Sequence, residues 1–233
     1  MTALPLTLTP LDLLALVLLT LAWFGVTRAI EHPPARRPSV SVLMKTYRRD
    51  WMRQFVRRDP RIFDGNILSS LREGTSFFAS ACMIAIGGGL ALLGNTDPLA
   101  GIARELDATE IPELLWKLKI LLVLLFVANA FLKFVWSHRL FGYCAIMMAA
   151  VPNDPAQPEA LPRALAAAQV NIQAARNFNL GLRAVYFALG ALGWLAGPWG
   201  LIAGTVVVTG MTLRREFASG SRRAILEDLG ERR

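Results

Sequence analysis

The stretch Ile111–Val151 decides the fold, and it reads IPELLWKLKILLVLLFVANAFLKFVWSHRLFGYCAIMMAAV. No glycine or proline interrupts it between Pro112 and Gly142. At about 1.5 Å per residue, the segment from Pro112 to Val151 would form a helix roughly 60 Å long, whereas the hydrocarbon core of a bilayer is about 30 Å thick. The stretch therefore predicts a membrane-spanning helix that continues well beyond the bilayer.

The composition of the whole chain agrees with a membrane protein. Mean hydropathy is +0.43, and 54% of the 233 residues are hydrophobic. These values are typical of a membrane protein with short polar segments. We predict an all-α, polytopic helical membrane protein that forms one domain, residues 1–233. The predicted spans are residues 11–29, 74–94, 113–135 and 184–213.

The net charge of +8 comes mainly from arginine and is unevenly distributed along the chain. Residues 28–72 carry 11 Lys or Arg against 4 Asp or Glu, whereas residues 95–113 carry 5 acids and 1 Arg. Basic loops of membrane proteins face the cytoplasm, where the lipid surface is anionic. We therefore expect an inner-membrane protein with its N-terminus outside and with residues 28–72 and 136–183 in the cytoplasm. This account of the charge argues against a nucleic-acid partner.

A basic amphipathic helix is predicted after Ser39. Apolar residues recur at helical spacing from Val40 to Phe55, and basic residues fill the other positions. One interpretation places this helix in the membrane interface, with its arginines facing anionic phospholipid. The other docks the same apolar face on another part of the protein. The expected lipid-facing residues are Arg48, Arg49, Arg53, Arg57 and Arg58.

Acidic and small residues mark the first two spans. Asp12 is predicted to cap the first span, and Asp64 the helix that leads into the second. Within the second span, Ala81, Ala85 and Gly89 recur at four-residue spacing. We expect these small residues to let a neighbouring helix approach closely.

Polar side chains are few in the third span. Lys117 and Lys119, near its outer end, are expected to snorkel to the membrane surface. The intramembrane polar residues are Asn129 and Lys133, which share one helix face with Ser137. Asn129 is expected to hydrogen-bond a neighbouring helix; the alternative is a solute site.

The last apolar segment, residues 184–213, is broken at Gly197-Pro198. Read as one kinked span, the residues from Ala184 to Met211 would form a helix of about 42 Å, which is too long without strong tilt. Read as a short hairpin, the segment turns at Gly-Pro, a typical turn dipeptide. The hairpin is favoured because it keeps the arginine-rich tail in the cytoplasm.

Motifs that carry chemistry are missing from the sequence. We find no metalloprotease, hydrolase, P-loop or dinucleotide-binding motif, and the two histidines are too few and too differently placed for a paired haem site. We therefore expect neither a metal nor another cofactor. Cys82 and Cys144 stand alone in apolar surroundings and are expected to be small buried residues.

One candidate functional cluster gathers polar residues at the expected cytoplasmic ends of the helices. Buried charges need partners, so Arg139, Arg176 and Arg183 are expected to pair with Asp59 or Asp64. The cluster consists of Asp59, Arg61, Asp64, Trp136, His138, Arg139, Asn177 and Arg183.

Several short motifs together give the chain a family resemblance. They are Arg58-Asp59-Pro60-Arg61-Ile62, Phe77-Phe78-Ala79-Ser80, Phe134-Val135-Trp136-Ser137-His138-Arg139-Leu140-Phe141, Phe178-Asn179 with Gly181-Leu182-Arg183-Ala184, and Arg215-Glu216-Phe217. With Asp64, Tyr143, Trp194 and Gly197-Pro198, this combination resembles the domain of unknown function 599 family of bacterial and plant membrane proteins. Gly142 departs from the asparagine expected in that family. The resemblance implies a membrane fold and no particular activity.

Three functions remain open on the sequence. The favoured hypothesis is a non-catalytic scaffold that binds anionic phospholipid, another membrane protein or a second copy of itself. The alternative is a small-solute or ion transporter, which a polar cavity reaching Asn129 would favour. The third is an interfacial lipid-modifying enzyme, which carboxylates converging with His138 around a pocket would favour.

Overall fold

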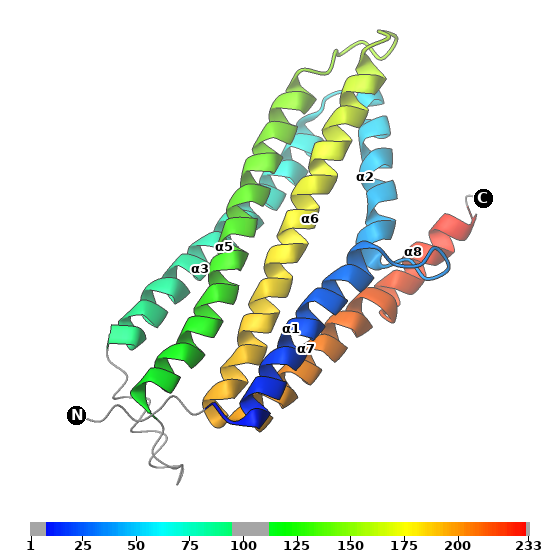
Figure 1. Cartoon of the computed structure of the whole chain (residues 1–233). Helices are drawn as coiled ribbons and strands as arrows, with labels where there is room; N and C mark the ends of the chain where they lie inside the picture. The colour runs from blue at the N-terminus through cyan, green and yellow to red at the C-terminus, as the bar shows by residue number, and fades with distance from the viewer. Residues whose placement is uncertain (1–7, 95–111, 232–233) are drawn as a thin grey trace.

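The computed structural model describes residues 8–94 and 112–231. Within these residues the chain is helical and contains no strand, which confirms the all-α prediction. The predicted acidic loop, residues 95–113, falls almost wholly outside the described residues. The helices are α1 (Pro10–Glu31), α2 (Val40–Arg57), α3 (Ile62–Gly94), α5 (Glu113–Ala149), α6 (Ala160–Leu192), the short 3-10 helix η1 (Gly193–Ala196), α7 (Pro198–Phe217) and α8 (Gly220–Glu231) (Figure 1).

Among the described residues, four helical segments are long and apolar enough to cross a membrane: α1, α3, α5, and α6 together with η1. The stretch quoted first forms α5, a single helix of 37 residues, as predicted. It packs along α6: the Ser137 hydroxyl donates to the Ala174 carbonyl at 2.7 Å. The ring of Phe134 lies against Gly181, where a Cβ atom would come within 2.7 Å of the ring. The absence of a side chain at this glycine lets α5 and α6 lie close together.

The chain turns back between α6 and α7, which confirms the hairpin alternative (Figure 1). Gly197 has a φ of 98°, a left-handed conformation that favours glycine, and Pro198 begins α7. Next to the turn, α6 and α7 lie very close to each other at positions occupied by glycine. A Cβ atom on Gly204 would lie 2.3 Å from the Gly190 carbonyl oxygen. The first arm is longer than the apolar segment that begins at residue 184, because α6 continues without a break from Ala160.

A hydrogen bond ties the beginning of α1 to this turn. Asp12 forms the predicted cap with Thr9 and also accepts a hydrogen bond from Trp194 Nε1 at 2.7 Å. The beginning of α1 and the α6–α7 turn therefore lie at one end of the molecule, and the ends of α1 and α7 lie toward the other (Figure 1). Lys119 is buried here, at 2% exposure, above the Trp116 ring. The expectation that Lys119 snorkels was wrong, because neighbouring helices cover it and Asp12 provides an opposite charge.

Helix α2 docks on the bundle, so the second of its two interpretations is confirmed. Ser39 caps the helix. Met52, Phe55 and Val56 are buried in a core shared with α3, α5 and α6. The apolar face of α2 is therefore covered by protein and is not available to insert into lipid.

Candidate functional site

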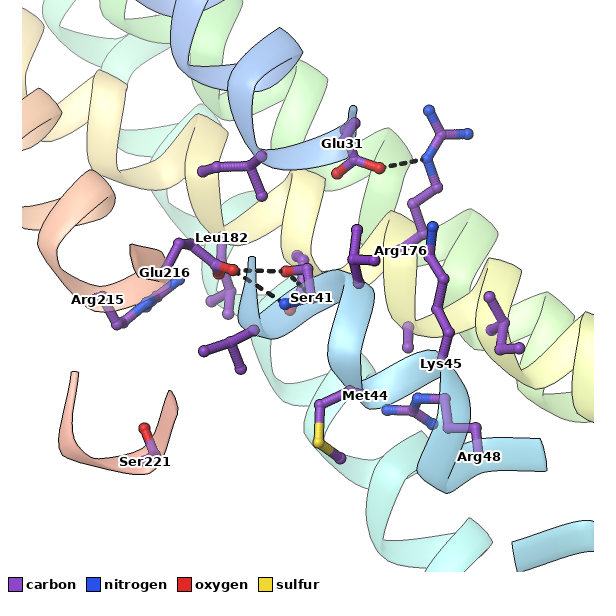
Figure 2. Close-up of a pocket in the computed structure, with 16 residues that line it drawn as sticks. Glu31, Ser41, Met44, Lys45, Arg48, Arg176, Leu182, Arg215, Glu216 and Ser221 are labelled. Carbon is purple, nitrogen blue, oxygen red and sulfur yellow. Dashed lines mark hydrogen bonds and ion pairs between the residues drawn. The ribbon is translucent and has the colours of Figure 1, made fainter. Parts of the chain in front are cut away.

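A charged cavity of about 400 Å³ lies where the end of α1, the beginning of α2, the middle of α6 and the end of α7 meet (Figure 2). We call it the basic pocket. Among its lining residues are two acids and four bases: Glu31, Glu216, Lys45, Arg48, Arg176 and Arg215. It brings together residues more than 180 positions apart in the chain, which local sequence patterns do not predict.

Glu31 is held by two arginines of α6. It ends α1, and its side chain is 7% exposed. Arg176 Nε donates to it at 2.7 Å and Arg183 Nη2 at 3.2 Å (Figure 2 shows the first). An acid in the last turn of a helix faces the negative end of the helix dipole, so these two cations offset an unfavourable position. The carboxylate of Glu31 is thus neutralised from within the protein.

Glu216 is held by the beginning of α2. The backbone N–H and the hydroxyl of Ser41 both donate to its carboxylate at 3.0 Å (Figure 2). The positive end of the α2 dipole favours a carboxylate there. Asn179 Nδ2 donates in turn to the Ser41 hydroxyl at 3.4 Å. This chain of contacts joins α7, α2 and α6 across the pocket.

Two of the basic side chains that line the pocket, Arg48 and Arg215, have neutral hydrogen-bond partners. Arg48 donates to the amide oxygen of Asn171, and burial lowers the pKa of its guanidinium because the charged form loses hydration. Arg215 donates to the Tyr186 hydroxyl at 2.8 Å and lies over that ring. Both partners are neutral. With Lys45 and Arg176, four cations line the pocket against two carboxylates, so the lining can accept an anion.

The candidate cluster from the sequence is spread over several places. Asp64 is fully buried inside the first turn of α3 and does not cap it; it accepts from Trp51 Nε1 at 2.6 Å and pairs with Arg58. The cap prediction was wrong because α3 begins at Ile62. Arg61 donates to the carbonyls of Val151 and Pro152 at 2.8 and 2.7 Å.

The remaining cluster members lie elsewhere. Nδ1 of the His138 ring is 3.2 Å from the hydroxyl of Thr75 on α3. Asn177 donates to a carbonyl of its own helix, while Asp59, Trp136 and Arg139 are exposed. The predicted partners of Arg176 and Arg183 were wrong: both pair with Glu31. Arg139 instead donates to the hydroxyl of Tyr143, the residue one turn ahead on α5.

The arginines expected to face lipid differ in their surroundings. Arg48 lines the basic pocket. Arg58 pairs with Asp64, and Arg53 pairs with Asp50 on the surface at 2.7 Å. Arg57 is exposed, and Arg49 is half-buried.

The polar residues of the third span lie away from this pocket. Asn129 and Lys133 are half-buried, and neither lines the basic pocket. Both predicted free cysteines, Cys82 and Cys144, are buried. In the described part of the chain, no group of three or more His, Cys, Asp or Glu side chains is placed to hold a metal ion.

Glu31 is a residue of the candidate site that sequence reasoning missed. Its position in the sequence could have indicated this role, because Glu31 is an acid at the end of an apolar span, where the helix dipole disfavours negative charge. Such a residue calls for a cationic partner. The partner itself lies on a helix 145 residues later, beyond any local pattern.

The fold and the site define a polytopic helical membrane protein with a basic pocket at one end of its spans. The family described as "Protein of unknown function, DUF599" matches residues 14–221, and the chain belongs to that family. No curated protein and no solved structure matches the chain.

Proposed function

We propose that this protein is a non-catalytic membrane component that binds the headgroup of an anionic phospholipid in the basic pocket. One observation carries the proposal: four basic side chains line the cavity, and its two carboxylates already have donors inside the protein. An entering phosphate would therefore meet unmatched positive charge. Arginine and lysine both bind phosphate through charge-assisted hydrogen bonds.

The position of the pocket along the spans supports a lipid headgroup over a soluble anion. Glu31 is the last residue of the first apolar span, and Arg214 and Arg215 end the apolar part of α7. Headgroups of a bilayer lie where apolar spans end. A volume of about 400 Å³ is within the range of roughly 300–1,000 Å³ for small-molecule sites.

Lipid binding in the pocket can be tested by purifying the protein with its native lipids and identifying those that remain bound. In the test variant, Lys45→Gln and Arg215→Gln are combined, which removes two pocket charges and leaves both ion pairs of Glu31 in place. The control combines Arg53→Gln and Arg57→Gln, which removes two charges from the exposed surface of α2.

We expect wild type and the control to retain anionic phospholipid and the pocket variant to lose it. Each near-surface basic residue contributes about 1 kcal/mol of attraction to anionic lipid, so two losses correspond to roughly 30-fold weaker binding. Equal retention by all three proteins would overturn the proposal.

The same proposal places the pocket on the cytoplasmic face of the inner membrane. The charge bias supports this orientation, since residues 28–72 carry 11 Lys or Arg. The N-terminus would then lie outside and the C-terminus in the cytoplasm. A reporter fused at residue 233 tests the orientation: a cytoplasm-active reporter should work there, and activity of a periplasm-active reporter would contradict it.

A further inference from the structure

An apolar crevice of about 530 Å³ lies between α3, α5 and α6. Every element that lines it is a candidate membrane span. The lining includes Phe77, Ala85 and Gly88 of α3, Leu124 of α5 and Leu189 of α6, and these side chains present only hydrocarbon. The crevice shares no residue with the basic pocket.

The small residues of α3 shape this crevice. Gly89 closes one part of it, because a Cβ atom there would lie 2.4 Å from Leu124. At the adjacent Gly88 no atom lies within 4 Å of an added Cβ, so the space remains open. The expectation of a close helix seam therefore holds at Gly89, whereas Ala81 and Ala85 line open space.

The length and volume of the crevice limit what can fill it. On α3 it extends from Phe77 to Leu92, which corresponds to about 22 Å at 1.5 Å per residue. A polar ligand is disfavoured along this length, because the lining side chains are almost entirely apolar. Water is excluded as well, because an apolar cavity offers it no hydrogen-bond partners.

We propose that one acyl chain of a bilayer phospholipid fills this crevice. An extended hydrocarbon chain is long and narrow, needs no hydrogen bonds and is the surrounding solvent of the spans. In the crevice the acyl chain is packed against protein on several sides. It therefore makes more dispersion contacts than it makes with the mobile chains of the bilayer. This site does not depend on the basic pocket, because the crevice carries no charge that selects a headgroup.

Two adjacent glycines provide a matched test. Gly88→Leu would place a side chain in the crevice, whereas Gly87→Leu changes a neighbour that also has open space but lies outside the lining. Both variants are purified in mild detergent, and phospholipid retained per protein is counted by native mass spectrometry. We expect Gly88→Leu to lower occupancy of one lipid about tenfold or more, since its side chain replaces several methylene groups. Gly87→Leu should behave like wild type, and equal retention by both variants would overturn the proposal.

Wild-type protein supplies a second test that does not depend on folding of a variant. A phosphatidylcholine carrying a photoreactive diazirine on its acyl chain is reconstituted with the protein and irradiated. Crosslinks should concentrate on crevice residues such as Ala85 and Leu189. Crosslinks spread evenly over outward residues such as Ile84, which is 77% exposed, would contradict the proposal, as would protein dimers that exclude lipid from the crevice.

Discussion

The basic pocket and the apolar crevice are cavities of similar size, about 400 and 530 Å³, lined by successive sections of the same helix. The first section of α6 contributes Arg176 and Asn179 to the pocket, and the second contributes Ala188 and Leu189 to the crevice. The pocket is braced by ion pairs to α1 and by hydrogen bonds between α7 and α2. No charged residue lines the crevice, so no ion pair braces it.

The two sections of α6 are stabilised in different ways. A charge taken out of water must be paired inside the protein, so the pocket section requires fixed partners. An apolar section has no such requirement, because lipid can cover it. We therefore expect loss of a paired charge in the pocket section to lower stability, and substitutions in the crevice to change lipid retention with little effect on stability.

The largest effect is expected from Glu31→Gln. This change leaves Arg183, at 2% exposure, without its carboxylate. Removing one partner of a buried ion pair costs about 3–5 kcal/mol. Thermal unfolding in detergent should show a large fall in Tm. The control, Glu73→Gln, removes an exposed carboxylate on α3; an equal fall in both would break the distinction between the two sides.

A somewhat smaller effect is expected from Met52→Ala on α2. Met52 is fully buried between α2 and the bundle, and truncating a buried methionine to alanine costs about 2–5 kcal/mol. The matched control is Met211→Ala on α7, where the side chain is 48% exposed. Tm should fall for Met52→Ala alone. An unchanged Tm would mean that α2 does not dock on the bundle.

The smallest of the stability effects compares two glycines directly. Gly204→Ala places a Cβ atom against the Gly190 carbonyl, and such overpacking costs about 1–3 kcal/mol. Gly88→Ala enters open space in the crevice and should be neutral or stabilise α3 by up to about 1 kcal/mol, since alanine favours helix over glycine. Opposite shifts of Tm are expected. Equal destabilisation would show that the crevice is as tightly packed as the hairpin.

Local signals in the sequence were sufficient for much of the fold. The uninterrupted apolar stretch predicted α5, Ser39 predicted the beginning of α2, and Gly197-Pro198 predicted the reversal into α7. Each of these rests on neighbours in the chain. A separate helical segment before residue 184 was expected because Asn171, Gln173 and their polar neighbours interrupt the apolar pattern; in the structure they lie within the continuous helix α6.

The candidate site was less predictable, because it depends on contacts between distant helices. The sequence indicated that Arg176 and Arg183 need partners, but the expected partners were Asp59 or Asp64 rather than Glu31. Periodicity reports which face of a helix is buried and not which helix covers it. The same limit explains why Lys119 was expected to reach the membrane surface. It lies near the end of a span in the sequence, but other helices cover it in the structure.

We infer that the pocket selects a headgroup and that the crevice holds an acyl chain. Combining two variants with two lipids separates these two roles. The Lys45→Gln and Arg215→Gln double variant and Gly88→Leu are each reconstituted with phosphatidylglycerol and with phosphatidylcholine, and retained lipids are counted by native mass spectrometry. The double variant should lose phosphatidylglycerol alone, and Gly88→Leu should lose one lipid of either kind. The same loss in both variants, or none in either, would contradict the account.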